Sequence, residues 1–127
     1  MKKKLFGISG IVIILIAIIG VPTISAIQQK RKEDVVVAFA ADIQTFVTKH
    51  NGKLPSNWDE FCRWNTSEGN KNWSQDLLEN YFLILNPPKD ADSRTPTYIY
   101  IKDRRIKSME WDLNELIYTA KTKAEGS

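Results

Sequence analysis

The sequence has very few of the residues on which catalysis and metal binding usually depend. Among its 127 residues there is one cysteine, Cys62, and one histidine, His50. One cysteine excludes an internal disulfide, and no cluster of histidine, cysteine and carboxylate side chains supplies the three or four ligands of a zinc site. A Cys62–His50 pair would also need an orienting third residue, which the spacing does not suggest. We therefore expect no enzymatic activity and no cofactor.

The sequence also lacks a charge imbalance outside its first four residues. The formal net charge is +3, and three of the 18 lysines and arginines are Lys2, Lys3 and Lys4, which leaves 15 basic against 15 acidic residues. A nucleic-acid-binding surface carries a concentrated basic excess. A glycine-rich phosphate-binding loop is missing too. The sequence thus indicates neither a nucleic-acid partner nor a small-molecule substrate.

Charge is missing altogether from Leu5 to Ile27, where isoleucine, valine and leucine dominate. A bilayer core is spanned by about 20 apolar residues in a helix, so we expect residues 5–27 to form a transmembrane or signal-anchor helix behind a basic leader at residues 1–4. We expect a single-pass protein of the inner cell membrane with a cytoplasmic N-terminus. Residues 28–122 would form a globular domain on the periplasmic or extracellular side.

Three fates of this front end stay open. A cleaved secretory signal would end at Ala26, although Ile24 is large for the third position before such a site. An uncleaved signal anchor would keep the whole apolar run in the membrane. A short basic leader could instead be removed between Gly7 and Ile8, with the apolar helix retained.

Helical periodicity is clear after the apolar run. Apolar residues at helical spacing form one stripe from Val36 to Val47, and polar side chains take the opposite face. We expect an amphipathic helix at about residues 34–51, either continuous with the apolar helix or separate from it. The pair Asn51-Gly52 is typical of a left-handed helix end.

A compact turn, which we call the elbow (residues 52–61, GKLPSNWDEF), follows this helix. Gly52 is expected to end the helix, and Pro55 to fix the turn. Ser56 and Asp59 have the spacing of a capping pair for a short helix. The residues expected to form the elbow and to pack it against the preceding apolar stripe are Gly52, Leu54, Pro55, Trp58 and Phe61.

Shorter elements complete the pattern. Ser74 can cap a helix that runs to Leu85 and ends at the prolines that follow. Tyr98–Ile101 alternates like a strand, and residues 106–111 would return as its partner. Asp112 would cap a last short helix, and residues 123–127 would form a loose tail. The expected fold class is α+β, with a long N-terminal helix packed on a small antiparallel sheet with short helices.

Three stretches, in this order, resemble type IV pilin-like proteins, most of all the pseudopilins of type II secretion systems. They are the apolar helix that runs into an amphipathic one, the stretch NGKLPSNWDEF at residues 51–61, and YFLILNPPKD at residues 81–90 followed by TPTYIY at 95–100. Together they cover most of the chain up to Tyr100. One departure is clear: the family has a glutamate five residues past the cleavage glycine, and this sequence has Val12 there.

The resemblance implies a structural function, in which the apolar helix packs against other such helices and a small head is presented outside the membrane. The implied partners are the membrane and other pilin-like subunits or secretion-assembly proteins. Asp90 and Asp92 are calcium candidates, because alternate loop carboxylates can bind this ion and the major pseudopilins hold calcium in this region; a solvated acidic turn is the other interpretation. The alternative function is a signal-anchored or exported small binding domain with no filament role.

Overall fold

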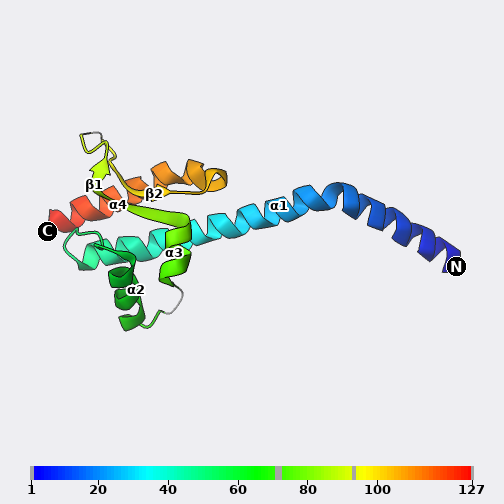
Figure 1. Cartoon of the computed structure of the whole chain (residues 1–127), viewed down its shortest axis with the longest axis horizontal. Helices are drawn as coiled ribbons and strands as arrows, with labels where there is room; N and C mark the ends of the chain where they lie inside the picture. The colour runs from blue at the N-terminus through cyan, green and yellow to red at the C-terminus, as the bar shows by residue number, and fades with distance from the viewer. Residues whose placement is uncertain (1, 71–72, 93, 127) are drawn as a thin grey trace. The chain divides into compact units, whose positions relative to one another are not determined.

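The computed structural model describes residues 2–70, 73–92 and 94–126, with side chains from residue 24 onward. The chain divides into two compact units, Met1–Lys32 and Glu33–Ser127. Helix α1 (Lys2–Lys49) accounts for the first unit and for the beginning of the second (Figure 1). The long N-terminal helix expected from the sequence is therefore present.

The second unit combines helices with a small sheet (Figure 1). After α1 it contains α2 (Trp58–Ser67), α3 (Gln75–Tyr81), β1 (Phe82–Lys89), β2 (Thr97–Ile101), the 3-10 helix η1 (Arg104–Met109) and α4 (Glu110–Glu125). The strands pair antiparallel, with Phe82 opposite Ile101 and Ile84 opposite Ile99, and the register is irregular between Ile84 and Lys89. The predicted α+β class with a small antiparallel sheet is confirmed.

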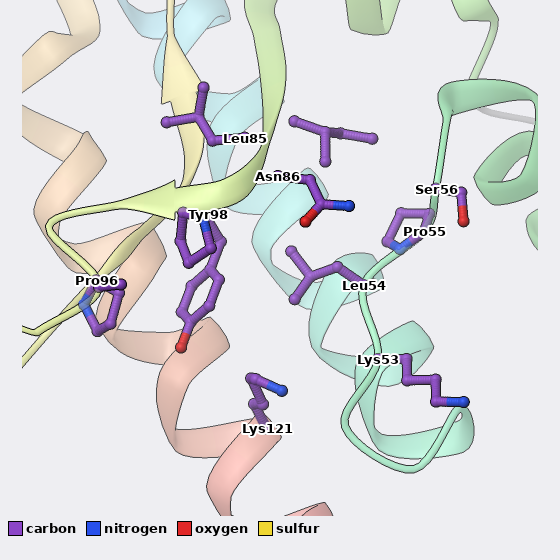
Figure 2. Close-up of a pocket in the computed structure, with 12 residues that line it drawn as sticks. Lys53, Leu54, Pro55, Ser56, Leu85, Asn86, Pro96, Tyr98 and Lys121 are labelled. Carbon is purple, nitrogen blue, oxygen red and sulfur yellow. The ribbon is translucent and has the colours of Figure 1, made fainter.

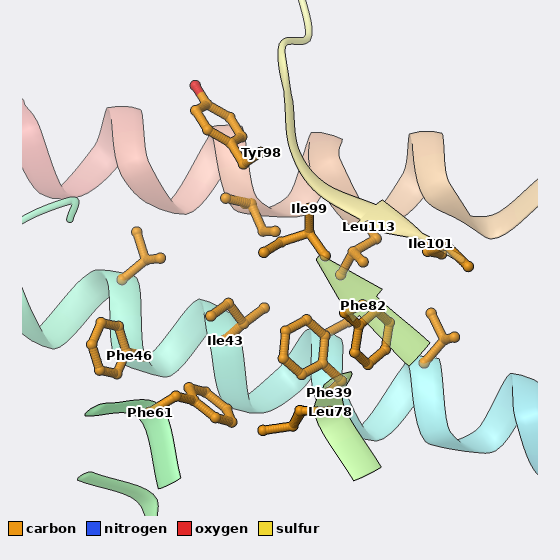
Figure 3. Close-up of a cluster of buried hydrophobic side chains, with 14 of the residues drawn as sticks. Phe39, Ile43, Phe46, Phe61, Leu78, Phe82, Tyr98, Ile99, Ile101 and Leu113 are labelled. Atoms are coloured by element: carbon orange, nitrogen blue, oxygen red, sulfur yellow. The ribbon is translucent and has the colours of Figure 1, made fainter. Parts of the chain in front are cut away.

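One hydrophobic core lies between α1, α4 and the sheet (Figure 3). Phe39 is fully buried there and stacks on Phe82, with ring centroids 4.2 Å apart. Trp58, Phe61 and Trp73 surround the same ring at centroid distances of 5.6–5.9 Å. Aromatic pairs at these separations stabilise a core beyond the area that they bury.

The apolar stripe predicted on α1 faces this core. Its buried members are Val36, Phe39, Ala40, Ile43, Phe46 and Val47. From the other side of the core, α4 contributes the buried side chain of Leu113 (Figure 3). Ile117 of the same helix is also buried. Each fully buried side chain of this size stabilises the fold by about 1.5–3 kcal/mol relative to its exposed state. The amphipathic half of α1 is therefore held to α4 by their shared core.

The first difference from the sequence prediction concerns Leu85, which lies in a strand and not in a helix. Helix α3 ends at Tyr81, because Phe82 already has extended dihedral angles of φ −133° and ψ 153°. Strand β1 begins at this residue. Periodicity alone cannot separate a strand from a helix in a short apolar run such as residues 82–85, and the pairing with β2 decides the outcome.

The return strand expected at residues 106–111 is also wrong. The Asp103 carboxylate accepts a hydrogen bond from the Arg105 backbone N–H at 2.9 Å and starts η1, and α4 follows directly. Helix α4 begins at Glu110 and continues to Glu125. The short helix expected to begin at Asp112 is thus part of a longer helix, which includes residues 123–125 of the expected tail; residue 127 lies outside the described residues.

Side chains of α4 close the outer edge of β2, where a third strand was expected. The Asn114 amide oxygen accepts hydrogen bonds from the backbone N–H groups of Tyr98 at 2.7 Å and Ile99 at 2.9 Å. The Asn114 amide nitrogen donates to the Ile99 carbonyl at 2.9 Å. The Glu110 carboxylate accepts from the Ile101 N–H at 2.8 Å. These bonds satisfy main-chain groups that an exposed edge strand would leave open.

Candidate functional site

The elbow begins where α1 ends, at a left-handed turn. Asn51 and Gly52 have φ angles of 57° and 85°. The Gly52 N–H donates to the Val47 carbonyl at 2.8 Å, and the Lys53 N–H donates to the His50 carbonyl at 3.1 Å. These bonds satisfy carbonyl groups that the last turn of a helix otherwise leaves unpaired.

Helix α2 is capped by Asn57 and not by Ser56. Asn57 has an extended conformation with φ −157°, and its side-chain oxygen accepts a hydrogen bond from the Glu60 N–H at 2.8 Å. Ser56 is exposed and lies one residue too early for this geometry. Trp58 and Phe61 are both buried in the core, so α2 is packed against the amphipathic part of α1.

The elbow also contacts α4, a relationship that sequence reasoning missed. The Lys121 ammonium donates to the Gly52 carbonyl at 3.1 Å, and it pairs with the Glu125 carboxylate. A Cβ added to Gly52 would lie 2.7 Å from the Glu125 Cγ and 3.0 Å from the Lys121 carbonyl oxygen. Glycine at position 52 therefore serves both the positive φ and the close approach of α4.

Replacing Gly52 with alanine is expected to lower the free energy of unfolding by about 1–3 kcal/mol, since the side chain adds strain at positive φ and displaces α4. Gly69→Ala is the matched control, because Gly69 has a φ of 89° and no heavy atom lies within 4 Å of the place that a Cβ would take. Guanidinium unfolding of the full chain, followed by tryptophan fluorescence, measures both. Equal losses would show that the contact with α4 contributes nothing.

His50 and Cys62 have separate structural environments. The His50 ring stacks on Phe46 with centroids 3.8 Å apart, and its Nδ1 lies 2.7 Å from the Phe46 carbonyl oxygen. Cys62 is half-buried beside the core. Burial, together with the nearby Asp59 carboxylate, raises the pKa of the Cys62 thiol. A nucleophilic cysteine needs a lowered pKa, so this environment disfavours the thiolate.

Asp90 and Asp92 lie in the turn after β1, and both are exposed. Asp90 has a φ of 55°, which an aspartate tolerates in a turn. Residue 93, between Asp92 and Arg94, is outside the described residues. Across the described part of the chain, no three histidine, cysteine or carboxylate side chains gather where they could hold a metal ion.

The candidate processing positions all lie in α1. Gly7 and Ile8, like Val12, fall in the part of the helix whose side chains are outside the described residues. Ala26 is exposed on the described part. From residue 24 onward, among the residues described, no helix has an apolar stretch long enough to cross a bilayer. Most of the apolar run Leu5–Ile27 precedes that region.

One groove in the second unit lies between α1 and the segment from η1 to α4, and we call it the helix groove. Its volume is about 390 Å³. The lining residues are Val36, Val37, Ala40, Ala41, Gln44, Met109, Asp112, Leu113 and Leu116. Val37 is 61% exposed and Leu116 is 43% exposed, so large apolar side chains border this groove in solvent.

A second groove, the elbow groove, lies between the elbow and β1 (Figure 2). Its volume is about 400 Å³. Leu54 of the elbow and Asn86 of β1 point toward each other across it, and the Tyr98 side chain points toward the last turns of α4, where Lys121 lies (Figure 2). Burial raises the pKa of the Tyr98 hydroxyl, and the positive charge of Lys121 lowers it by a smaller amount.

Sequence reasoning missed the polar residues that join distant segments. Asn114 is buried on the same apolar face of α4 as Leu113 and Ile117. A polar residue within an apolar helical stripe was the sequence feature that could have identified it as a structural hydrogen-bonding residue. Trp73 donates its indole N–H to the Asp42 carboxylate at 2.6 Å, and no local sequence pattern predicts this bond.

Comparison with known proteins finds no matching family model, no matching curated protein and no matching solved structure.

Proposed function

We propose that this protein is a membrane-anchored structural subunit of the pilin or pseudopilin type. In this proposal, residues 5–27 form the single membrane-spanning helix, and residues 33–127 form an extracytoplasmic head. The uncharged run Leu5–Ile27 and the resemblance at the elbow support it. The packing of a small α+β head on the amphipathic half of a long helix supports it further.

The observation that carries the proposal is the helix groove. Its walls are mostly apolar, and Ala40 and Ala41 leave room for a close helix–helix approach. Contiguous exposed apolar surface on a folded domain is typical of an interaction site. A helix from a neighbouring copy would bury Val37 and Leu116, which solvent otherwise contacts. Association of copies through this groove is the structural activity that we propose.

Cysteine cross-linking in membranes tests this association. One chain would carry Val37→Cys and a second Leu116→Cys, each in a Cys62→Ala background; the two would be expressed together, and a bifunctional maleimide would be added to intact cells. We expect cross-linked dimers, because both positions lie at the interface between copies, and each cross-link must join two copies since every chain has one cysteine. Asn70→Cys in the same background is the matched control, since Asn70 is exposed and outside the groove. Monomers alone from the co-expressed variants would contradict the proposal.

The intact mass and N-terminus of the mature protein separate this function from its alternative. A chain that starts at Ile8 has lost only a basic leader and keeps its apolar helix, as an assembling subunit requires. A chain that starts at Ile27 is an exported domain, which removes the membrane anchor and contradicts the proposal. An intact N-terminus with no multimers favours the signal-anchored binding domain.

A further inference from the structure

We propose that the elbow groove binds a short extended segment of a partner protein, and that this segment adds a strand to the outer edge of β1. The segment would be apolar where it lies along β1 and acidic at the end near Lys53 and Lys121. The proposal rests on the described residues of the head, and it holds whether or not copies of the chain assemble.

The outer edges of the two strands differ in how their main-chain groups are hydrogen-bonded. Asn114 and Glu110 pair the outward main-chain groups of β2, and the Lys107 ammonium donates to the Ile101 carbonyl at 3.1 Å. No corresponding bond to β1 occurs at Ile84 among the residues described. One edge is closed by side chains, and the other keeps its main-chain groups available.

The register shows which groups of β1 are available. The Lys102 N–H donates to the Tyr81 carbonyl at 3.0 Å, and the antiparallel pattern alternates from there. Ile84, which is paired with Ile99, therefore directs its N–H and C=O away from β2. In the close-up, the labelled elbow residues lie on the side of β1 opposite to β2, and these main-chain groups are directed to that side (Figure 2). An extended peptide can exchange two hydrogen bonds with one such residue.

The walls of the groove match an extended apolar chain. Apolar residues that line it include Leu54 and Pro55 of the elbow, Ile84 and Leu85 of β1, and Pro96. The length of the added strand is limited, because the prolines at positions 87 and 88 have no N–H to offer and interrupt the edge. We expect roughly three residues of the partner to lie in the extended conformation.

The positive charge of the groove favours a partner segment with an acidic end. The described residues that line the groove include two lysines, Lys53 and Lys121, and no aspartate or glutamate. Lys121 already binds the Gly52 carbonyl and Glu125, whereas the Lys53 side chain is exposed to solvent. A carboxylate side chain on the partner therefore pairs with Lys53 at the rim and fixes the direction of the added strand.

Nuclear magnetic resonance of the full ¹⁵N-labelled chain in detergent micelles tests the proposal with three synthetic peptides, each acetylated and amidated. The probe has the sequence TVIVDE. The second peptide, TVIVKK, reverses the charge of the end. The third has the probe sequence with N-methyl groups on the backbone nitrogens of its two central residues, so it keeps the side chains and loses those two main-chain donors. With millimolar probe we expect shifted resonances and slowed amide exchange at Ile84. We expect no such change with the methylated peptide.

The variant Lys53→Glu measures the role of charge. Lys53 is exposed and outside the core, so the fold is retained, and we expect the probe to bind about three- to tenfold more weakly. Arg104→Glu is the matched control, because Arg104 is exposed on η1 and does not line the groove. Equal binding of TVIVDE and TVIVKK, or of the methylated probe, would overturn the proposal. So would the absence of any shift at Ile84, or shifts there that depend only on the concentration of the chain itself.

Discussion

Replacing Phe39 with alanine is expected to lower the free energy of unfolding of the head by about 3–5 kcal/mol. The Phe39 ring has no exposed area and contacts four other aromatic rings, including the stacked ring of Phe82. These rings come from α2, β1 and the segment before α3, so they cannot all move into the space that the deleted ring leaves. Removing the ring therefore costs both its transfer free energy and a cavity. Guanidinium unfolding followed by tryptophan fluorescence measures the loss.

A variant on the same helix provides the control for this prediction. Val37→Ala lies two residues from Phe39, and Val37 is 61% exposed. We expect it to change the free energy of unfolding by no more than about 0.5 kcal/mol, because an exposed side chain makes few packing contacts that the substitution could remove. Both substitutions introduce alanine into the same turn of α1, so they differ mainly in the packing that they remove. A loss of similar size in the two would mean that α1 is not held through this aromatic cluster.

The regular parts of the fold could be predicted because they obey a local rule. The stripe from Val36 to Val47 follows the helical period over several turns, and no other regular structure satisfies that pattern. The strand Tyr98–Ile101 is recognisable because aromatic and β-branched residues alternate in its sequence, and the structure places it in β2 (Thr97–Ile101). Asn51-Gly52 at the end of α1 combines two residues that tolerate positive φ. In each case the sequence pattern lies within the element that it predicts, so no distant residue is needed to recognise that element.

The errors arose where the outcome depends on a partner segment. Residues 82–85 satisfy a helix as well as a strand, and pairing with β2 selects the strand. Residues 106–111 were expected to pair with β2, but Asn114 and Glu110 already occupy that edge. A local pattern contains no information about whether a third strand or the side chains of α4 will pair with the outer edge of β2 in the folded chain. Tertiary contacts therefore overrode the propensity of both segments.

The candidate site shows the same limit. The elbow was recognisable from the glycine and proline spacing of residues 52–55, since each residue acts on its own backbone. Its clamp to α4 was not, because Lys121 and Gly52 are separated by 69 positions in sequence. The elbow groove is lined by residues of the elbow, of β1 and by Lys121 of α4, which come from distant parts of the sequence. Their proximity is not encoded by any local pattern.

Asn114→Ala is expected to lower the free energy of unfolding by about 3 kcal/mol. The substitution leaves the Tyr98 N–H and both main-chain groups of Ile99 without the partners that they have at 2.7–2.9 Å. A buried polar group left unpaired costs about 1–3 kcal/mol, and neighbouring losses add only in part. Guanidinium unfolding followed by tryptophan fluorescence measures this change as well. Amide exchange at Ile99 reports the loss locally.

Asn65→Ala isolates the hydrogen bonds from the burial of the amide. Asn65 is 1% exposed and Asn114 is 2% exposed, so the two substitutions remove the same atoms from similarly buried positions. Both polar atoms of the Asn65 side chain lack a partner among the described residues. Its removal relieves a desolvation cost, and we expect a change within about 1 kcal/mol. Equal losses would contradict the argument that α4 closes β2 through hydrogen bonds. A selective loss at Asn114 would also open the second edge of the sheet, and concentration-dependent aggregation of that variant alone is the expected consequence.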